Sequence, residues 1–133
     1  RRNINGGKMT KKIQLTIDKE VFLAELNNSA TAESIFQSLP IEATGSTWGD
    51  EIYFGIPVEA TLEDPKESVE EGDLAYWPPG KAFCIFYGLT PASIENEIRP
   101  ASAVNVIGKI QGDTSSLKGK VGSAMVIIES IQS

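Results

Sequence analysis

The sequence contains no histidine and only one cysteine, Cys84. Without histidine there can be no Ser-His-Asp triad or Cys-His pair, and nearly all zinc sites are excluded. A single cysteine excludes an internal disulfide, and its place in the middle of an apolar strand indicates a buried, unreactive thiol. Motifs for a nucleophile elbow, a phosphate-binding loop or a dinucleotide fold are also missing. The sequence therefore assigns no catalytic residue, no metal site and no cofactor.

Positive charge is scarce as well. The 133 residues include 12 lysines and arginines against 18 acidic residues, which gives a formal net charge of −6. Nucleic acids and anionic membranes are bound by basic patches, so neither is an expected partner. No apolar run approaches the roughly 20 residues of a membrane span, and no signal-peptide core is visible. The default expectation is a cytoplasmic protein.

The acidic residues gather in short clusters at expected turns and helix ends. Carboxylates in such places complement backbone N–H groups or face water, so we expect all four clusters to be solvated. The clusters are Asp50-Glu51, Glu63-Asp64, Glu70-Glu71-Asp73 and Glu95-Glu97. A calcium loop would need a denser spacing of oxygen ligands.

Length and composition indicate one ordinary globular domain. The chain is 41% hydrophobic and 23% charged, and it is long enough to bury a single core. Residues 1–8 have no apolar periodicity and precede Met9, a plausible start, so we interpret them as a leader or cloning remnant. The predicted domain is therefore 9–133.

The stretch from Gly72 to Gly88 predicts two strands joined by a stiff turn. Side chains alternate with period two, and both faces of each strand are apolar, which is typical of a strand pair inside a barrel or sandwich. Pro78 and Pro79 cannot donate ladder hydrogen bonds, and Gly80 can adopt the positive φ of a tight reversal. This segment is the centre of the predicted fold.

The rest of the chain predicts further strands and two short helices. A hairpin is expected over 11–26, followed by a helix whose apolar stripe ends before Pro40, with Ser29 or Thr31 as its cap. Further strands are expected over 42–48, 51–61, 103–110 and 121–131, with a Gly49-Asp50 hairpin turn and a second helix over 64–71. The count is about eight strands without βαβ spacing, and eight strands can close into a barrel.

Aromatic side chains concentrate in the two central hairpins, and aromatic surface on an outer sheet face usually marks a binding site. Tyr53 is followed on its strand face by Gly55 and Pro57, which favours a shallow depression beside it, although a β-bulge explains Gly55 equally well. Arg99 is the only arginine outside residues 1–8; its loop position suits a ligand contact or a surface ion pair. The candidate ligand-binding residues are Tyr53, Phe54, Trp77, Phe83, Phe86, Arg99 and Asn105.

Residues 72–88 followed by 101–110, together with 47–54 and Pro57-Val58, resemble the small prokaryotic cyclophilin-like family. The resemblance extends from about residue 11 to the end of the chain. It implies a mainly β protein, a closed eight-stranded antiparallel barrel with short capping helices at its ends.

Cyclophilins are peptidyl-prolyl isomerases, and the resemblance implies where their residues would lie. In that family an arginine on the third strand donates to the prolyl nitrogen, beside a phenylalanine-lined cup with a glutamine, a tryptophan and a histidine. Here the corresponding strand, 42–48, has no arginine, the next strand lacks the glutamine, and histidine is absent. An apolar wall around Phe83, with Tyr53 and Asn105 on the same face, remains compatible with the cup.

Three functions therefore stay open. The first is a binding module that holds a peptide or a small apolar ligand against a surface of Tyr53, Phe83 and Trp77. The second is a weak isomerase in which Arg99 reaches in from its loop. The third is an interaction protein that forms a homo-oligomer through a strand edge or an aromatic patch.

Overall fold

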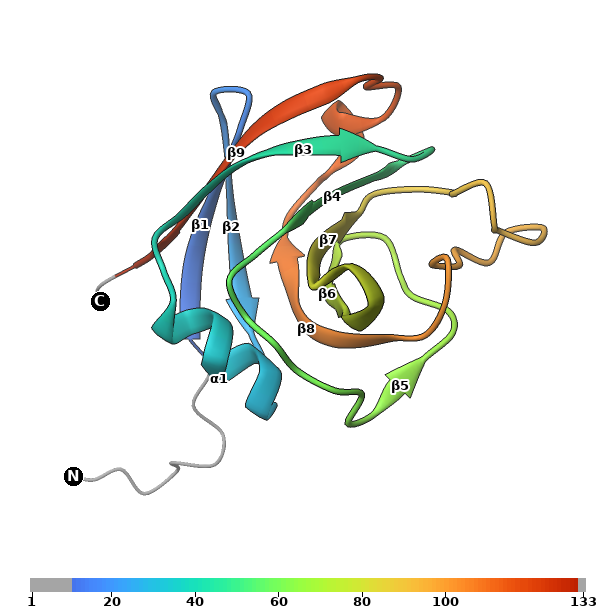
Figure 1. Cartoon of the computed structure of the whole chain (residues 1–133). Coiled ribbons are helices and arrows are strands. Elements are labelled where there is room, and N and C mark those ends of the chain that lie inside the picture. The colour runs from blue at the N-terminus through green and yellow to red at the C-terminus, as the bar shows by residue number, and fades with distance from the viewer. Residues whose placement is uncertain (1–10, 132–133) are drawn as a thin grey trace.

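The computed structural model describes residues 11–131, so the interpretation of residues 1–8 lies outside the described residues. Nine strands, one α-helix and two single 3-10 turns make up the described fold (Figure 1). The strands are β1 Lys11–Ile17, β2 Glu20–Leu26, β3 Ile41–Thr47, β4 Glu51–Gly55, β5 Pro65–Lys66, β6 Asp73–Trp77, β7 Ala82–Phe86, β8 Val104–Gln111 and β9 Ser123–Ser130. The helix is α1, Ala30–Gln37, and the 3-10 turns are Pro78–Gly80 and Ser115–Leu117.

Eight of the strands form a closed antiparallel barrel. Their order is β2-β1-β9-β3-β4-β7-β6-β8, and pairing of β2 with β8 closes the ring. The two-residue β5 pairs with the first two residues of β8, Val104 and Asn105. The fold class predicted from the sequence is thus confirmed. Within the described residues no helix is long and apolar enough to cross a membrane.

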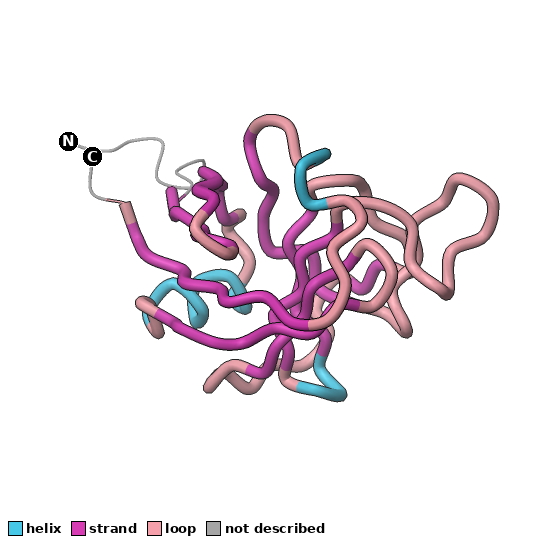
Figure 2. The backbone as a smooth tube through the Cα atoms, turned by 90° about the horizontal axis from the view of Figure 1, so that it is seen from above, coloured by secondary structure: helices cyan, strands magenta, loops and turns pink. Residues whose placement is uncertain are grey.

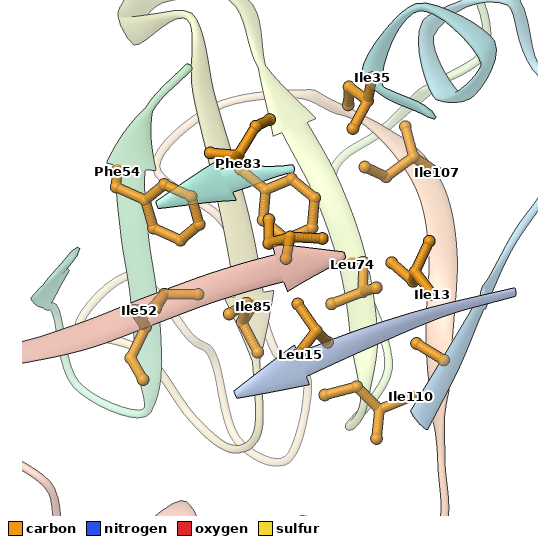
Figure 3. Packing of buried hydrophobic residues seen from close by; sticks show 14 of the residues in the cluster. Ile13, Leu15, Ile35, Ile52, Phe54, Leu74, Phe83, Ile85, Ile107 and Ile110 are labelled. Carbon is orange, nitrogen blue, oxygen red and sulfur yellow. The ribbon is translucent and has the colours of Figure 1, made fainter. Parts of the chain in front are cut away.

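The barrel core consists of the inward-facing residues that the period-two alternation predicts. Ile13, Leu15 and Ile17 of β1 are fully buried, as are Leu74 and Ile85 of the central hairpin. Figure 3 shows Ile13, Leu15, Leu74 and Ile85 pointing into the same interior from separate strands, with Ile35 of α1 above them. The interior is filled by side chains, as expected for eight strands.

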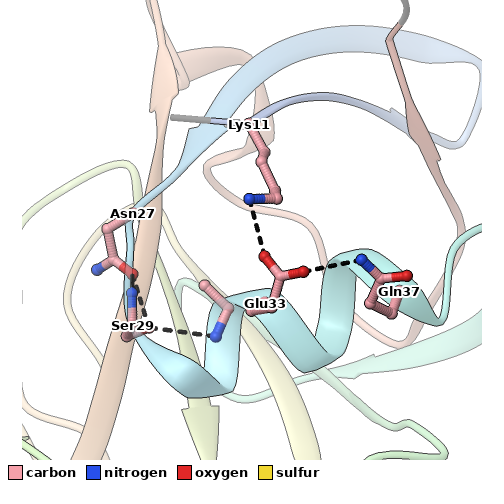
Figure 4. A network of polar contacts seen from close by, with 6 residues as sticks. Lys11, Asn27, Ser29, Glu33 and Gln37 are labelled. Carbon is pink, nitrogen blue, oxygen red and sulfur yellow. Dashed lines mark hydrogen bonds and ion pairs between the residues drawn. The ribbon is translucent and has the colours of Figure 1, made fainter. Parts of the chain in front are cut away.

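Helix α1 covers one end of this core, where the sequence predicts it (Figure 1). Ser29 is the N-cap, and its hydroxyl accepts a hydrogen bond from the backbone N–H of Ala32 at 3.1 Å. On the outer side of the helix, Glu33 pairs with Lys11 of β1 at 2.8 Å and accepts a hydrogen bond from Gln37 (Figure 4). The cap satisfies the first turn of the helix, and the ion pair links the helix to β1.

Three details differ from the sequence-based expectation. No helix forms over 64–71: Pro65 and Lys66 form β5 instead, because so short a segment is marginal as a helix and its backbone pairs with β8. The strand expected over 51–61 ends at Gly55, although Ile56 and Val58 are still buried in the core. Only one α-helix is present among residues 11–131, so the capping helix expected at the other end of the barrel is wrong.

The turn of the central hairpin is built differently from the prediction. Lys81, not Gly80, has the left-handed conformation, with a φ of 48°. Gly80 is required for another reason: a Cβ there would lie 2.9 Å from the Trp77 ring. The glycine therefore makes room for the indole that packs against the turn.

The seam that closes the barrel is especially tight at Gly108 of β8. This residue pairs with Leu26 of β2, and a Cβ placed on it would lie 2.3 Å from the carbonyl oxygen of Glu25. Because the obstacle is backbone rather than a flexible side chain, the two strands could accept a larger residue only by moving apart.

We therefore expect Gly108→Ala to lower the free energy of unfolding by about 2 kcal/mol or more, the cost typical of overpacking. Gly55→Ala is the matched control, since a Cβ at Gly55 of β4 meets nothing closer than the Gly80 carbonyl oxygen at 3.9 Å. Urea unfolding of both variants measures the difference. Equal stabilities would contradict a closure that depends on this close approach.

Candidate functional site

A second apolar cluster lies outside the barrel, on the outer face of the β4-β7-β6-β8 wall. We call it the outer cluster; it consists of Val69, Ala75, Ala82, Cys84, Phe86, Ile98 and Val104. The segments 65–72 and 88–103 cover it, and they are joined where the backbone N–H of Val69 donates to the Ile98 carbonyl at 2.9 Å. Residues 88–103 form the long loop that extends from the barrel at the right of Figures 1 and 2. The apolar outer face is thus largely buried under loops.

The covering segments leave one part of this face open, and a cavity of about 280 Å³ lies there. We call it the aromatic pocket; its lining residues are Trp48, Glu51, Tyr53, Trp77, Cys84, Pro100, Ala101 and Val104. They come from the end of β3, from β4, β6 and β7, and from the end of the 88–103 loop with the start of β8. Strands β4, β6, β7 and β8, the β3–β4 turn that carries Trp48 and the 88–103 loop therefore converge on one small apolar hollow.

The hollow exists because small side chains separate large ones on the outer face. Cys84 of β7 is paired with Tyr53 of β4 on one side and with Ala75 of β6 on the other. Two residues further along β6, Trp77 is paired with Ala82 of β7. Of these small residues, Cys84 lines the pocket, with the aromatic side chains of Tyr53 and Trp77 beside it. The depression predicted beside Tyr53 is therefore present, but its floor is built by Cys84 of the neighbouring strand, not by Gly55.

The two residues that flank the β3–β4 turn, Trp48 and Glu51, both line the pocket. The Trp48 backbone N–H donates to the Glu51 carbonyl at 2.9 Å across the Gly49-Asp50 turn, and Gly49 has a φ of 61°. The 88–103 loop packs directly on this turn, because a Cβ on Gly49 would come within 2.9 Å of the Leu89 carbonyl oxygen. The predicted two-residue turn is confirmed, and it holds Trp48 and Glu51 on the same rim.

The opposite wall is equally fixed. The Trp77 indole N–H donates to the Ser102 hydroxyl at 2.7 Å, and its six-membered ring lies over Gly80. Thr90 holds the two ends of the 88–103 loop together. Its hydroxyl donates to the Arg99 carbonyl, and its backbone N–H donates to the Ser93 hydroxyl at 2.9 Å. The pocket walls are therefore held in place without a ligand.

Glu51 is the chemically distinctive residue of the pocket. The residue is only 5% exposed, which corrects the expectation that this member of the Asp50-Glu51 cluster faces water. Burial raises the pKa of the Glu51 carboxyl to about 7, and a hydrogen bond with the Cys84 thiol only partly opposes that rise. Burial and the nearby carboxyl in turn raise the pKa of the Cys84 thiol well above its usual value, which makes it a poor nucleophile.

The surroundings of Glu51 are electronegative. Tyr87, inside the barrel wall, has its pKa raised to about 12 by burial and by the charges of Asp50 and Glu51. Its hydroxyl is buried and has no hydrogen-bond partner among the described residues. No lysine or arginine of the described chain lines the pocket, so nothing there neutralises an ionised Glu51.

Of the predicted site residues, the structure brings only Tyr53 and Trp77 into the pocket. Phe54 and Phe83 are on the other face, stacked in the barrel core at 5.4 Å between ring centroids, so their proposed place on the binding surface is wrong. Phe86 is on the outer face but lies fully buried in the outer cluster, away from the pocket lining.

The two polar candidates also lie elsewhere. Asn105 is buried and links three segments: its amide donates to the Thr31 hydroxyl and the Thr61 carbonyl, and its oxygen accepts from the Glu63 backbone N–H. Arg99 forms the expected surface ion pair, with Glu97 at 3.0 Å, and does not line the pocket.

Sequence reasoning missed Glu51, although one signal could have found it. Glu51 and Tyr53 share a strand face by the period-two rule, so a carboxyl beside an outward-facing aromatic residue could be read from the sequence. The burial of Glu51 could not be predicted from the sequence, because the loop that covers it is some 40–50 residues away along the chain.

The comparisons with known proteins agree with this architecture. The family model described as cyclophilin-like matches residues 11–129, and the chain belongs to that family. The solution structure of the hypothetical protein AF2241 from Archaeoglobus fulgidus is similar, with 41% identity, a TM-score of 0.78, and coverage of 93% of this chain and 97% of that one. The search of curated proteins found no match.

The buried carboxyl predicts an unusual dependence of stability on pH. Because the pKa of Glu51 is about 7 in the fold and about 4.5 ordinarily, the folded state holds a proton that the unfolded state has lost between those pH values. Stability contributed by the protonated form is complete below about pH 4.5 and is lost as the pH rises through 7. The loss should be on the order of 3 kcal/mol.

Glu51→Gln removes this titration while keeping the shape of the side chain. We expect the variant to be more stable than the wild type at pH 8 and to differ little at pH 5. Denaturant unfolding at the two pH values measures this difference. The control is Glu42→Gln at an exposed position on β3, which should leave the free energy of unfolding unchanged at both pH values. Since the chain has no histidine, few other groups should titrate in this range. A wild-type stability that is flat from pH 5 to 8 would contradict the burial of an isolated carboxyl.

Proposed function

We propose that this cyclophilin-like barrel is a binding module that holds a peptide side chain or a small, largely apolar ligand in the aromatic pocket. The observation that carries the proposal is the pocket itself: a hollow with aromatic walls that stays open on a sheet face otherwise covered by loops. Ligand sites are typically concave, mainly apolar and already formed before binding. The pocket has these properties.

The size of the pocket limits what it can hold. Sites for drug-sized ligands usually measure about 300–1,000 Å³, so a cavity of about 280 Å³ suits a single side chain or a compact molecule. The Trp77 indole is held by its hydrogen bond to Ser102 and the Trp48 backbone by its bond to Glu51, so binding should cost little conformational entropy.

Isomerase activity has no such support from the geometry. A group that donates to the prolyl nitrogen must lie in the site, and Arg99, the arginine considered from the sequence, is bound to Glu97 through both Nε and a terminal nitrogen. Binding without the donor is therefore the simpler function for this pocket.

A titration of the isotopically labelled protein with blocked Ala-Pro peptides and with 3,3-dimethylbutan-1-ol tests the proposal. We expect chemical-shift changes at the amides of 48–53 and 101–104, together with a change in tryptophan fluorescence. Tyr53→Ala should weaken binding about fivefold or more, because it removes one aromatic wall. The control is Leu23→Ala, an exposed residue on the outer face of β2.

Two results would contradict this proposal. One is the absence of any change at millimolar concentrations of the peptides, of the alcohol and of choline, the charged isostere of that alcohol. The other is a set of shifts that maps outside the pocket and is the same in the Tyr53→Ala protein. Light scattering on the same samples separates ligand binding from self-association, the third function considered from the sequence.

A further inference from the structure

The aromatic pocket combines aromatic walls with one buried carboxyl that has no basic partner among residues 11–131. We infer that the group it binds is an alkylammonium, such as the trimethylammonium of choline or of a trimethylated lysine side chain. This inference rests on the proposed binding function and names the chemical class of its ligand.

The aromatic side chains supply the first part of the recognition. Trp48, Tyr53 and Trp77 line the cavity from three different strands or strand ends. A cation against the face of an aromatic ring is attracted by the negative charge of the π system, and tryptophan is the strongest of these partners. A methylated ammonium also has an apolar surface, which suits the remaining lining of Pro100 and Val104.

The carboxyl supplies the second part. Two other carboxyl groups of the described chain are compensated: buried Asp73 pairs with Lys109 at 3.2 Å, and Glu63 accepts backbone N–H bonds at the start of α1. Glu51 is as deeply buried as Asp73, yet no lysine or arginine among residues 11–131 forms an ion pair with its carboxyl, which interacts with the Cys84 thiol instead. A buried carboxylate is costly unless a cation is paired with it.

The charge of the pocket also excludes other ligand classes. An anionic ligand would be repelled by Glu51 and by Asp50 behind it. A neutral apolar ligand would displace the remaining water from the carboxyl without forming an ion pair with it. Binding of such a ligand therefore favours the protonated acid. An ammonium ligand, in contrast, gains from the ionised carboxylate and from the rings together.

This preference should depend on pH in a defined direction. The titratable groups around Glu51 are Cys84 on β7, Tyr87 directly after β7, Tyr53 on β4 and the adjacent Asp50 in the turn; the other lining residues do not ionise. Since burial raises the pKa of Glu51 to about 7, the carboxylate needed for the cation is populated above that pH. The affinity for an ammonium should therefore rise as the pH increases.

The test compares choline with its neutral isostere 3,3-dimethylbutan-1-ol, which has the same shape without the charge. At pH 8.5 we expect choline to bind about 10-fold or more tightly, measured by chemical-shift titration and by calorimetry. At pH 5.5 this preference should shrink by a comparable factor, while binding of the isostere should not weaken. A blocked trimethyl-lysine, compared with free choline, distinguishes a protein side chain from a small metabolite as the source of the group.

Glu51→Gln is the decisive variant because it keeps the shape of the pocket and removes the charge. It should abolish the preference for choline and leave binding of the isostere unchanged or improved, whereas Glu42→Gln should behave as the wild type. A preference for choline that persists in Glu51→Gln would overturn the role of the carboxyl.

The outcomes distinguish a failure of the ammonium inference from a failure of the proposed binding function. Equal binding of choline and isostere in the pocket overturns the ammonium inference and leaves the binding module intact. The same holds if only the Ala-Pro peptides shift the pocket amides. Absence of binding by all the probes overturns both.

Discussion

The closure of the barrel is the constraint on which the rest of the structure depends. Strand β2 must meet β8 closely enough to complete the ring, and the bare backbone of Gly108 against the Glu25 carbonyl permits this approach. Once the ring is closed, all eight strands have two hydrogen-bonded neighbours and the inward residues form one core. Closure also fixes the outer face of β4, β6 and β7 as a rigid wall, on which a loop can be laid and a pocket left open.

The pocket illustrates how a closed barrel gains a site without opening its core. Large and small side chains alternate across the outer wall, so the hollow beside Cys84 needs no gap in the sheet. The loop that covers the rest of the face buries Glu51 along with the apolar residues, which moves the carboxyl toward neutrality at physiological pH. A residue that would be ordinary at an exposed turn thereby becomes the polar feature of an apolar site.

Much of the fold could be predicted from local patterns, and the failures have a common cause. The alternation in 11–26 and 72–88 and the Ser29 cap reflect forces that act within a few residues, and each was confirmed. The helix expected over 64–71 failed because pairing with β8, a strand about 40 residues away, outweighed a local helix signal. Phe54 and Phe83 were placed on the binding surface because both faces of their strands are apolar, and periodicity alone does not tell which face is inside.

By itself the sequence determined which residues share a strand face, where the chain turns, and which chemistry is unavailable, because side-chain alternation, turn residues and missing histidine are local properties. Only the tertiary structure decided which face became the core and which residues gathered around Tyr53 and Trp77. It also decided that Glu51 is buried, since burial results from the 88–103 loop closing over a sheet formed by distant strands. A side chain's exposure to water belongs to the whole fold, and the acidity of Glu51 follows from that exposure.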